Sequence, residues 1–209
     1  MHLSKVTSWG LIIGGLWASV GMLALFFGIL GVSDDMEPAE EFKKLQDNQE
    51  MALAFFIICV GVFAYLAKSF VQLAEAVNVA GEWYRYVRIM AILMVGSLLV
   101  SMSTWLILGE DATLEIQEAS DAVGNSVNSL FIIASAFVQL IIAWFALKNG
   151  LGNLIFKVFV AILGVLSVLD LVNIIVNGTG ESDLSFITWI LWAISVVVIG
   201  VLGLRTKEA

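Results

Sequence analysis

The sequence predicts an all-α membrane protein, a polytopic bundle of about six transmembrane helices, on three observations. The chain has 209 residues, of which 60% are hydrophobic and 13% are charged. Its mean hydropathy is +0.99, so its polar side chains are too few to cover a soluble globule of this size. The apolar residues also come in runs of about 20, the length of helix that crosses a hydrocarbon core roughly 30 Å thick. A multi-span helical protein is therefore expected.

Six apolar runs, separated by short polar stretches, are long enough to be spans. The chain has one proline, Pro38, and no linker rich in proline, glycine or serine, so residues 1–209 are expected to form a single domain. The first run exceeds the roughly 7 to 15 apolar residues of a signal-peptide core, which indicates a retained span. The predicted spans are residues 9–32, 51–77, 86–108, 128–147, 154–176 and 184–204.

The basic residues predict the orientation, because Lys and Arg beside the spans are retained on the cytoplasmic side. Only Lys43 and Lys44 of the ten basic residues lie at the ends that a cytoplasmic N-terminus would place outside. Both termini are therefore predicted to be cytoplasmic, in the inner membrane of a prokaryotic cell. The eight residues on the predicted inner side are Lys5, Lys68, Arg85, Arg88, Lys148, Lys157, Arg205 and Lys207.

The predicted outer loops, residues 33–50, 109–127 and 177–183, hold fourteen of the eighteen acidic residues. A solvated surface is the favoured interpretation, and a rim that concentrates cations or docks a basic partner is the alternative. In the first loop, Pro38 followed by acidic residues predicts a helix start. That helix is expected to continue into the second span.

Asp170 is the only acid well inside a predicted span, where an ionisable group needs a partner or water. At about 100° per residue, Asp170, Asn173 and Asn177 lie on one face of the fifth span, and this face is expected to contact protein. Either an ion or proton site or interhelical hydrogen bonding explains such groups, and the second is favoured. Other polar residues placed at a similar depth, which could complete one cluster, are Ser101, Thr104, Ser135 and Gln139.

Four glycines follow one face of the first span: Gly10, Gly14, Gly21 and Gly28. They lie within about 40° of one another on a helix. A stripe of small residues lets a second helix approach the backbone closely, so this face is predicted to pack against a helix of the same chain or of a neighbouring subunit. We expect Gly21→Leu to disrupt that packing.

The predicted inner ends of the second and third spans carry cations and an aromatic ring, namely Lys68, Trp83, Arg85 and Arg88. Tryptophan suits the headgroup region, and Lys and Arg attract anionic lipid. This segment is predicted to anchor the protein to membrane lipids. A docking surface for a partner is the alternative.

Motifs of catalysis are missing from the sequence. His2 is the only histidine and Cys59 the only cysteine, which leaves no axial pair for haem, no histidine-rich metal site and no Ser–His dyad. There is also no P-loop, GxSxG or dinucleotide fingerprint. We therefore expect no enzyme, no cofactor, no metal site and no nucleic-acid partner.

Two functions remain open at this point. The favoured one is a non-enzymatic accessory or scaffolding subunit that packs against other membrane proteins or against its own copies. The alternative is a small cation- or proton-coupled channel or transporter centred on Asp170.

Overall fold

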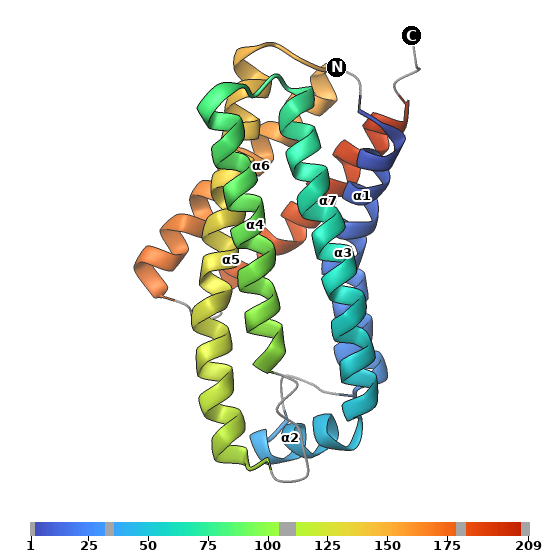
Figure 1. The fold of residues 1–209 in the computed structure, drawn as a ribbon, viewed down its shortest axis with the longest axis vertical. Helices are drawn as coiled ribbons and strands as arrows, with labels where there is room; N and C mark the ends of the chain where they lie inside the picture. Colours follow the sequence, from blue (N-terminus) through green and yellow to red (C-terminus); the bar gives the residue numbers. More distant parts are fainter. Residues whose placement is uncertain (1–2, 32–35, 105–111, 179–182, 206–209) are drawn as a thin grey trace.

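The computed structural model describes residues 3–31, 36–104, 112–178 and 183–205, and within these ranges the protein is helical with no strand (Figure 1). Five helices, α3 to α7, are long and apolar enough to cross a membrane. The α-helices are α1 Lys5–Leu16, α2 Pro38–Asp47, α3 Gln49–Ala76, α4 Gly81–Ser103, α5 Leu114–Lys148, α6 Leu154–Asn177 and α7 Asp183–Arg205.

Three predicted spans agree with the structure to within two residues at each end, namely the second, fifth and sixth, which are α3, α6 and α7. The third span begins five residues earlier than expected, at Gly81, and the predicted end of that span lies outside the described residues. These helices are recognisable because a long apolar run is a local property of the sequence.

The first predicted span is helical but not a regular α-helix. Beyond α1, the backbone continues through two π-helical segments, η1 Trp17–Gly21 and η2 Ala24–Ile29. The Ser19 hydroxyl donates to the Gly15 carbonyl oxygen at 2.8 Å. A side chain that bonds to the carbonyl four residues back competes with the regular backbone bond and bends helices, which fits the change of helix type here.

Helix α5 corrects the prediction of a loop at residues 109–127, because it starts at Leu114. The Thr113 side chain accepts a hydrogen bond from the Ile116 N–H at 3.4 Å and caps the helix. Its 35 residues extend about 52 Å at 1.5 Å per residue. This is more than a bilayer core requires, and α5 reaches further toward α2 than α6 and α7 do (Figure 1).

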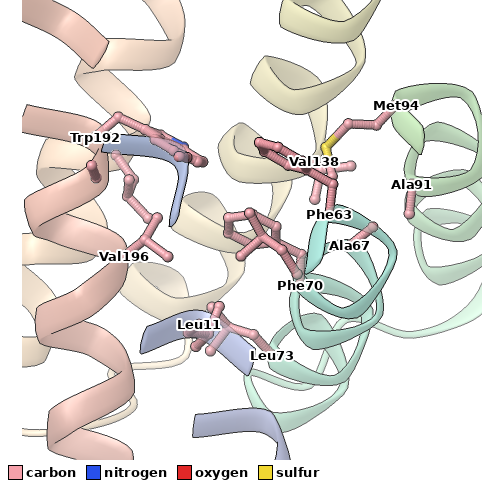
Figure 2. Packing of buried hydrophobic residues seen from close by; sticks show 14 of the residues in the cluster. Leu11, Phe63, Ala67, Phe70, Leu73, Ala91, Met94, Val138, Trp192 and Val196 are labelled. Atoms are coloured by element: carbon pink, nitrogen blue, oxygen red, sulfur yellow. The ribbon is translucent and has the colours of Figure 1, made fainter. Parts of the chain in front are cut away.

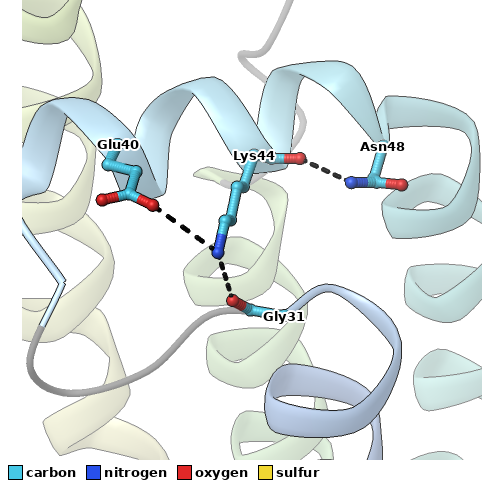
Figure 3. A network of polar contacts seen from close by, with 4 residues as sticks. All are labelled: Gly31, Glu40, Lys44 and Asn48. Carbon is cyan, nitrogen blue, oxygen red and sulfur yellow. Dashed lines mark hydrogen bonds and ion pairs between the residues drawn. The ribbon is translucent and has the colours of Figure 1, made fainter.

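Helix α2 begins at Pro38 as predicted but does not continue into α3. Asn48, with φ −113° and ψ 26°, separates the two helices, and α2 lies across the end of the bundle opposite the two termini (Figure 1). Lys44 Nζ donates to the Gly31 carbonyl oxygen at 2.8 Å and lies 3.7 Å from Glu40 (Figure 3). One of the two lysines predicted to lie outside thus connects α2 to the end of the first helical segment.

The long helices form a closed ring. Helices α3 to α7 each pack against the next along the chain, and α1 packs against both α3 and α7. The middle of the ring is filled with apolar side chains, among them Phe63 and Phe70 from α3, Val138 from α5 and Trp192 from α7 (Figure 2). The outer faces expose large apolar residues, as with Ile175 at 81%, which suits contact with lipid.

Candidate functional site

Asp170 lies on α6, with its side chain within hydrogen-bonding reach of Thr188 on α7. Its side chain is half-buried, whereas Thr188 is only 2% exposed. The Thr188 hydroxyl also lies 3.0 Å from the Ser185 carbonyl oxygen. The Asp170 side chain therefore faces the neighbouring helix and lies next to a hydroxyl group.

Asn173 and Asn177 extend this contact along α6 toward its C-terminal end. Asn173 Nδ2 donates to Ser185 Oγ of α7 at 2.9 Å, and Asn177 Nδ2 donates to Asn173 Oδ1 at 2.7 Å. Together with Asp170, these amides form a polar seam between α6 and α7. This is the face on which helical periodicity placed the three residues.

Ser135 and Gln139 form a second group, which joins α5 to α6. Gln139 Nε2 donates to Ser135 Oγ at 2.6 Å, and Gln139 Oε1 lies 3.3 Å from Ser167 Oγ. All three side chains are buried. Ser167 was not singled out from the sequence, although this residue precedes Asp170 by three positions and so lies on nearly the same face of α6.

Ser101 and Thr104 are separate from both groups. Thr104 Oγ1 donates to the Ser101 carbonyl oxygen at 2.7 Å, and both residues pack against Gly124 of α5. Gly124 precedes Gln139 by 15 residues, or about 22 Å of helix. The prediction of one cluster is thus corrected: its depths assumed a helix that starts at residue 128, whereas α5 starts at Leu114.

The glycine stripe of the first span divides into two halves. A Cβ atom on Gly10 would meet Ser69 and Tyr65 of α3, and one on Gly14 would lie 2.7 Å from Leu66 of α3. The three atoms nearest to a Cβ atom on Gly21 all belong to Trp17, four residues back in the chain, and a Cβ atom on Gly28 would meet nothing within 4 Å. The close contact inside this chain therefore involves the first half of the stripe.

A second close helix contact, between α1 and α7, was not predicted from the sequence. A Cβ atom on Gly200 would lie 2.7 Å from the Ser8 carbonyl oxygen and 2.8 Å from Ile12 Cγ1. Gly203, one turn further along α7, would likewise meet Ser8 and Leu3. The only signal in the sequence is the spacing of the two glycines in the last span.

The predicted anchor residues lie on the surface near the turn between α3 and α4. Lys68, Arg85 and Arg88 are exposed, and Trp83 is 56% exposed. Arg85 Nη1 forms an ion pair of 2.8 Å with Glu82. The turn itself is held to the end of α5, because Asn149 Nδ2 donates to the carbonyl oxygen of residue 77 at 3.0 Å.

The part of the chain that the structure describes contains no group of three or more His, Cys, Asp or Glu side chains that could hold a metal ion. Cys59 is buried and accepts a hydrogen bond from Trp17 Nε1 at 3.2 Å.

Comparisons with protein-family models, with curated proteins and with solved structures found no match. The function is therefore argued from this geometry alone.

Proposed function

We propose that the protein is a non-enzymatic integral membrane subunit with an accessory or scaffolding role in a membrane complex. The observation that carries the proposal is the use of the polar side chains within the helices. The side chains of Asp170 and Asn173 contact α7, and the side chain of Gln139 lies against Ser167 of α6. Each group thus connects a helix to its neighbour.

The energetics of such contacts support a structural role. Polar pairs between membrane helices average about 0.6 kcal/mol, so a few of them fix the register of α5, α6 and α7 without adding much stability. A conducting pathway, by contrast, needs polar groups around a water-filled space. The middle of the ring is instead filled by Phe63, Phe70 and Trp192.

The proposal includes a topology and a class of partner. The α1, η1 and η2 segments form the first of six crossings, and both termini lie in the cytoplasm of a prokaryotic cell, with α2 on the outer membrane surface. The even number is supported by the start of α1 and the end of α7, which lie at one end of the bundle (Figure 1). The partners are lipids and either other membrane proteins or further copies of this chain.

A second candidate, cation- or proton-coupled transport, is favoured by the seam between α6 and α7. A half-buried carboxylate, Asp170, is followed toward the end of α6 by the amides of Asn173 and Asn177. Trp192, one turn along α7 from Thr188, buries its Nε1 with no hydrogen-bond partner among the described residues. Carboxylate and amide oxygens can coordinate a cation.

Two substitutions of Asp170 distinguish the candidates. Asp170→Asn retains the size and most of the hydrogen-bonding capacity but removes the charge, whereas Asp170→Leu removes both. For a structural role, we expect Asn to leave the melting temperature nearly unchanged and Leu to lower it, because Leu cannot make a polar contact with Thr188 of α7. Ion or proton flux in reconstituted vesicles that is abolished by Asp170→Asn would refute the subunit proposal.

The proposed complex is tested by purification from the native membrane. A tagged chain solubilised in mild detergent should retain a membrane protein or a second copy in fixed proportion. The matched control is an unrelated tagged six-span protein treated identically. Recovery of the chain as a lone monomer under several detergents, together with flux in vesicles, would favour the transport candidate.

A further inference from the structure

A groove of about 540 Å³ runs along the outer face of the ring between α3 and α4, which stand side by side in Figure 1. Its walls are almost entirely apolar, with Ala64 and Ala67 from α3 facing Val95, Gly96 and Leu99 from α4. This volume lies within the range of about 300–1,000 Å³ that is typical of ligand pockets. It is separate from the polar seam near Asp170, and the inference drawn from it rests on the membrane location and the lipid partner of the function proposed above.

Small side chains account for the space. Ala64 is exposed on α3, and a Cβ atom placed on Gly96 would meet nothing within 4 Å. Larger residues at these positions would fill the groove, as Leu66 does where α3 meets α1 at Gly14. An open and mostly apolar groove between two helices that are able to cross a membrane suits an acyl chain.

Two cations stand at one end of the groove, the end nearer the turn between α3 and α4. Lys68 and Arg88 both line it, and within the described residues neither forms a hydrogen bond or an ion pair. Arg85, three residues before Arg88, is in contrast paired with Glu82 at 2.8 Å. Among the described residues, neither cation thus has a carboxylate within ion-pairing distance.

The depth of these cations places them near lipid headgroups. Arg88 follows the start of α4 at Gly81 by seven residues, or about 10 Å of helix. Lys68 precedes the end of α3 at Ala76 by eight residues, or about 12 Å. Long basic side chains at this depth extend toward the headgroup layer, where the guanidinium group can bind a phosphate through two hydrogen bonds.

We propose that this groove binds one anionic phospholipid from the leaflet nearest the two termini. The phosphate-bearing headgroup lies between Lys68 and Arg88, and one acyl chain lies along Ala64, Gly96 and Leu99. The charge complementarity selects an anionic over a zwitterionic lipid, because basic pockets between membrane helices bind such headgroups. The occupant is a lipid because charge and apolar length occur in one continuous groove.

The test measures lipid bound to the purified full-length protein by native mass spectrometry, with phosphatidylglycerol and phosphatidylcholine of matched chains titrated in separate experiments. We expect tighter binding of phosphatidylglycerol. Lys68→Gln and Arg88→Gln should each weaken it by about fivefold, the effect of one basic residue near a charged lipid surface. Gly96→Leu, or Ala64→Leu if the first variant does not fold, should reduce the occupancy of both lipids.

Two matched variants serve as controls. Lys148→Gln removes an exposed cation from the same end of the bundle but outside the groove. Gly28→Leu adds the same side chain at an exposed glycine of η2, outside the groove, where a Cβ atom would meet nothing within 4 Å. Both should bind lipid like the unchanged protein, with unchanged melting temperatures.

Three results would overturn the proposal. The first is an equal loss of phosphatidylglycerol in Lys148→Gln, which would indicate general surface attraction. The second is unchanged occupancy in both groove-filling variants, or competition by inorganic phosphate alone that matches competition by the lipid. The third is a dimer that Gly96→Leu converts to monomers, which would assign the groove to a second copy of the chain.

Discussion

Gly200→Ala should destabilise the protein through the contact between α7 and α1. The added Cβ atom would lie 2.7 Å from the Ser8 carbonyl oxygen, 2.8 Å from Ile12 Cγ1 and 3.1 Å from the Ile12 nitrogen. Ordinary van der Waals contact begins at 3.4 Å, so the first of these distances is too short by about 0.7 Å. Two of the three atoms belong to the backbone of α1, which cannot move out of the way by changing a rotamer.

The loss of unfolding free energy arises because the added Cβ atom pushes α7 away from α1. Overpacking a closely packed site costs about 1–3 kcal/mol, and the upper part of that range applies where backbone atoms must move. A gap of 0.5–1 Å between packed atoms also loses about a quarter to a half of their attraction. We expect Gly200→Ala to reduce the free energy of unfolding by about 2–3 kcal/mol.

The matched control is Gly61→Ala, an exposed glycine of α3 where a Cβ atom would meet nothing within 4 Å. Alanine is favoured over glycine in a helix by about 1 kcal/mol, so this variant should be neutral or slightly more stable. Unfolding in mixed detergent micelles, followed by tryptophan fluorescence, gives both free energies. Equal stabilities of Gly200→Ala and Gly61→Ala, within about 0.5 kcal/mol, would refute the close packing of α1 on α7.

Further substitutions test the remaining contacts. Gly14→Leu, whose side chain would meet Leu66 of α3, should lower the melting temperature more than Gly21→Leu, whose nearest neighbour is Trp17. The reverse order would contradict the packing of α1 on α3. Burial raises the pKa of Asp121 in the extension of α5, against the opposing effect of its hydrogen bond from Gln117. Its contribution to stability is therefore present below the ordinary pKa of aspartate and lost as the pH rises through the raised value. Asp121→Asn should be at least as stable at neutral pH, and its melting temperature should change less as the pH rises above about 4, the ordinary pKa of aspartate. A melting temperature that changes more with pH would contradict this. Lys44→Met removes the bond to Gly31 and, because the site is exposed, should cost less than about 1 kcal/mol. Its clearest sign should be faster hydrogen exchange in α2, and unchanged exchange would count against the role of Lys44.

The polar residues of the spans could be placed correctly within one helix from the sequence, but not relative to residues of other helices. Helical periodicity placed Asp170, Asn173 and Asn177 on one face, and these residues form the seam against α7. Periodicity relates residues within one helix, where every position is fixed by a constant rotation. Matching depths between helices needs the start of each helix, and the starting point assumed for α5 was wrong by 14 residues.

The start of α5 was missed for a physical reason. Residues 114–127 mix acidic and small polar residues with isolated apolar ones, a composition that hydropathy assigns to a loop. Their helix is stabilised instead by the cap at Thr113 and by burial of Gln117, Ser120 and Gly124. Amphipathic helices of this kind depend on tertiary contacts more than on their own propensity.

By itself, the sequence determined the helical membrane character of this protein and the extents of α3, α6 and α7, because twenty consecutive apolar residues have few other stable states in or near a bilayer. Only the tertiary structure decided which glycines lie against another helix. Gly10, Gly14 and Gly200 touch another helix, whereas Gly28 and Gly96 face open space. In membranes, helices associate through close packing and not through hydrophobicity, so the partner of each face depends on shapes that meet only when the ring of helices closes.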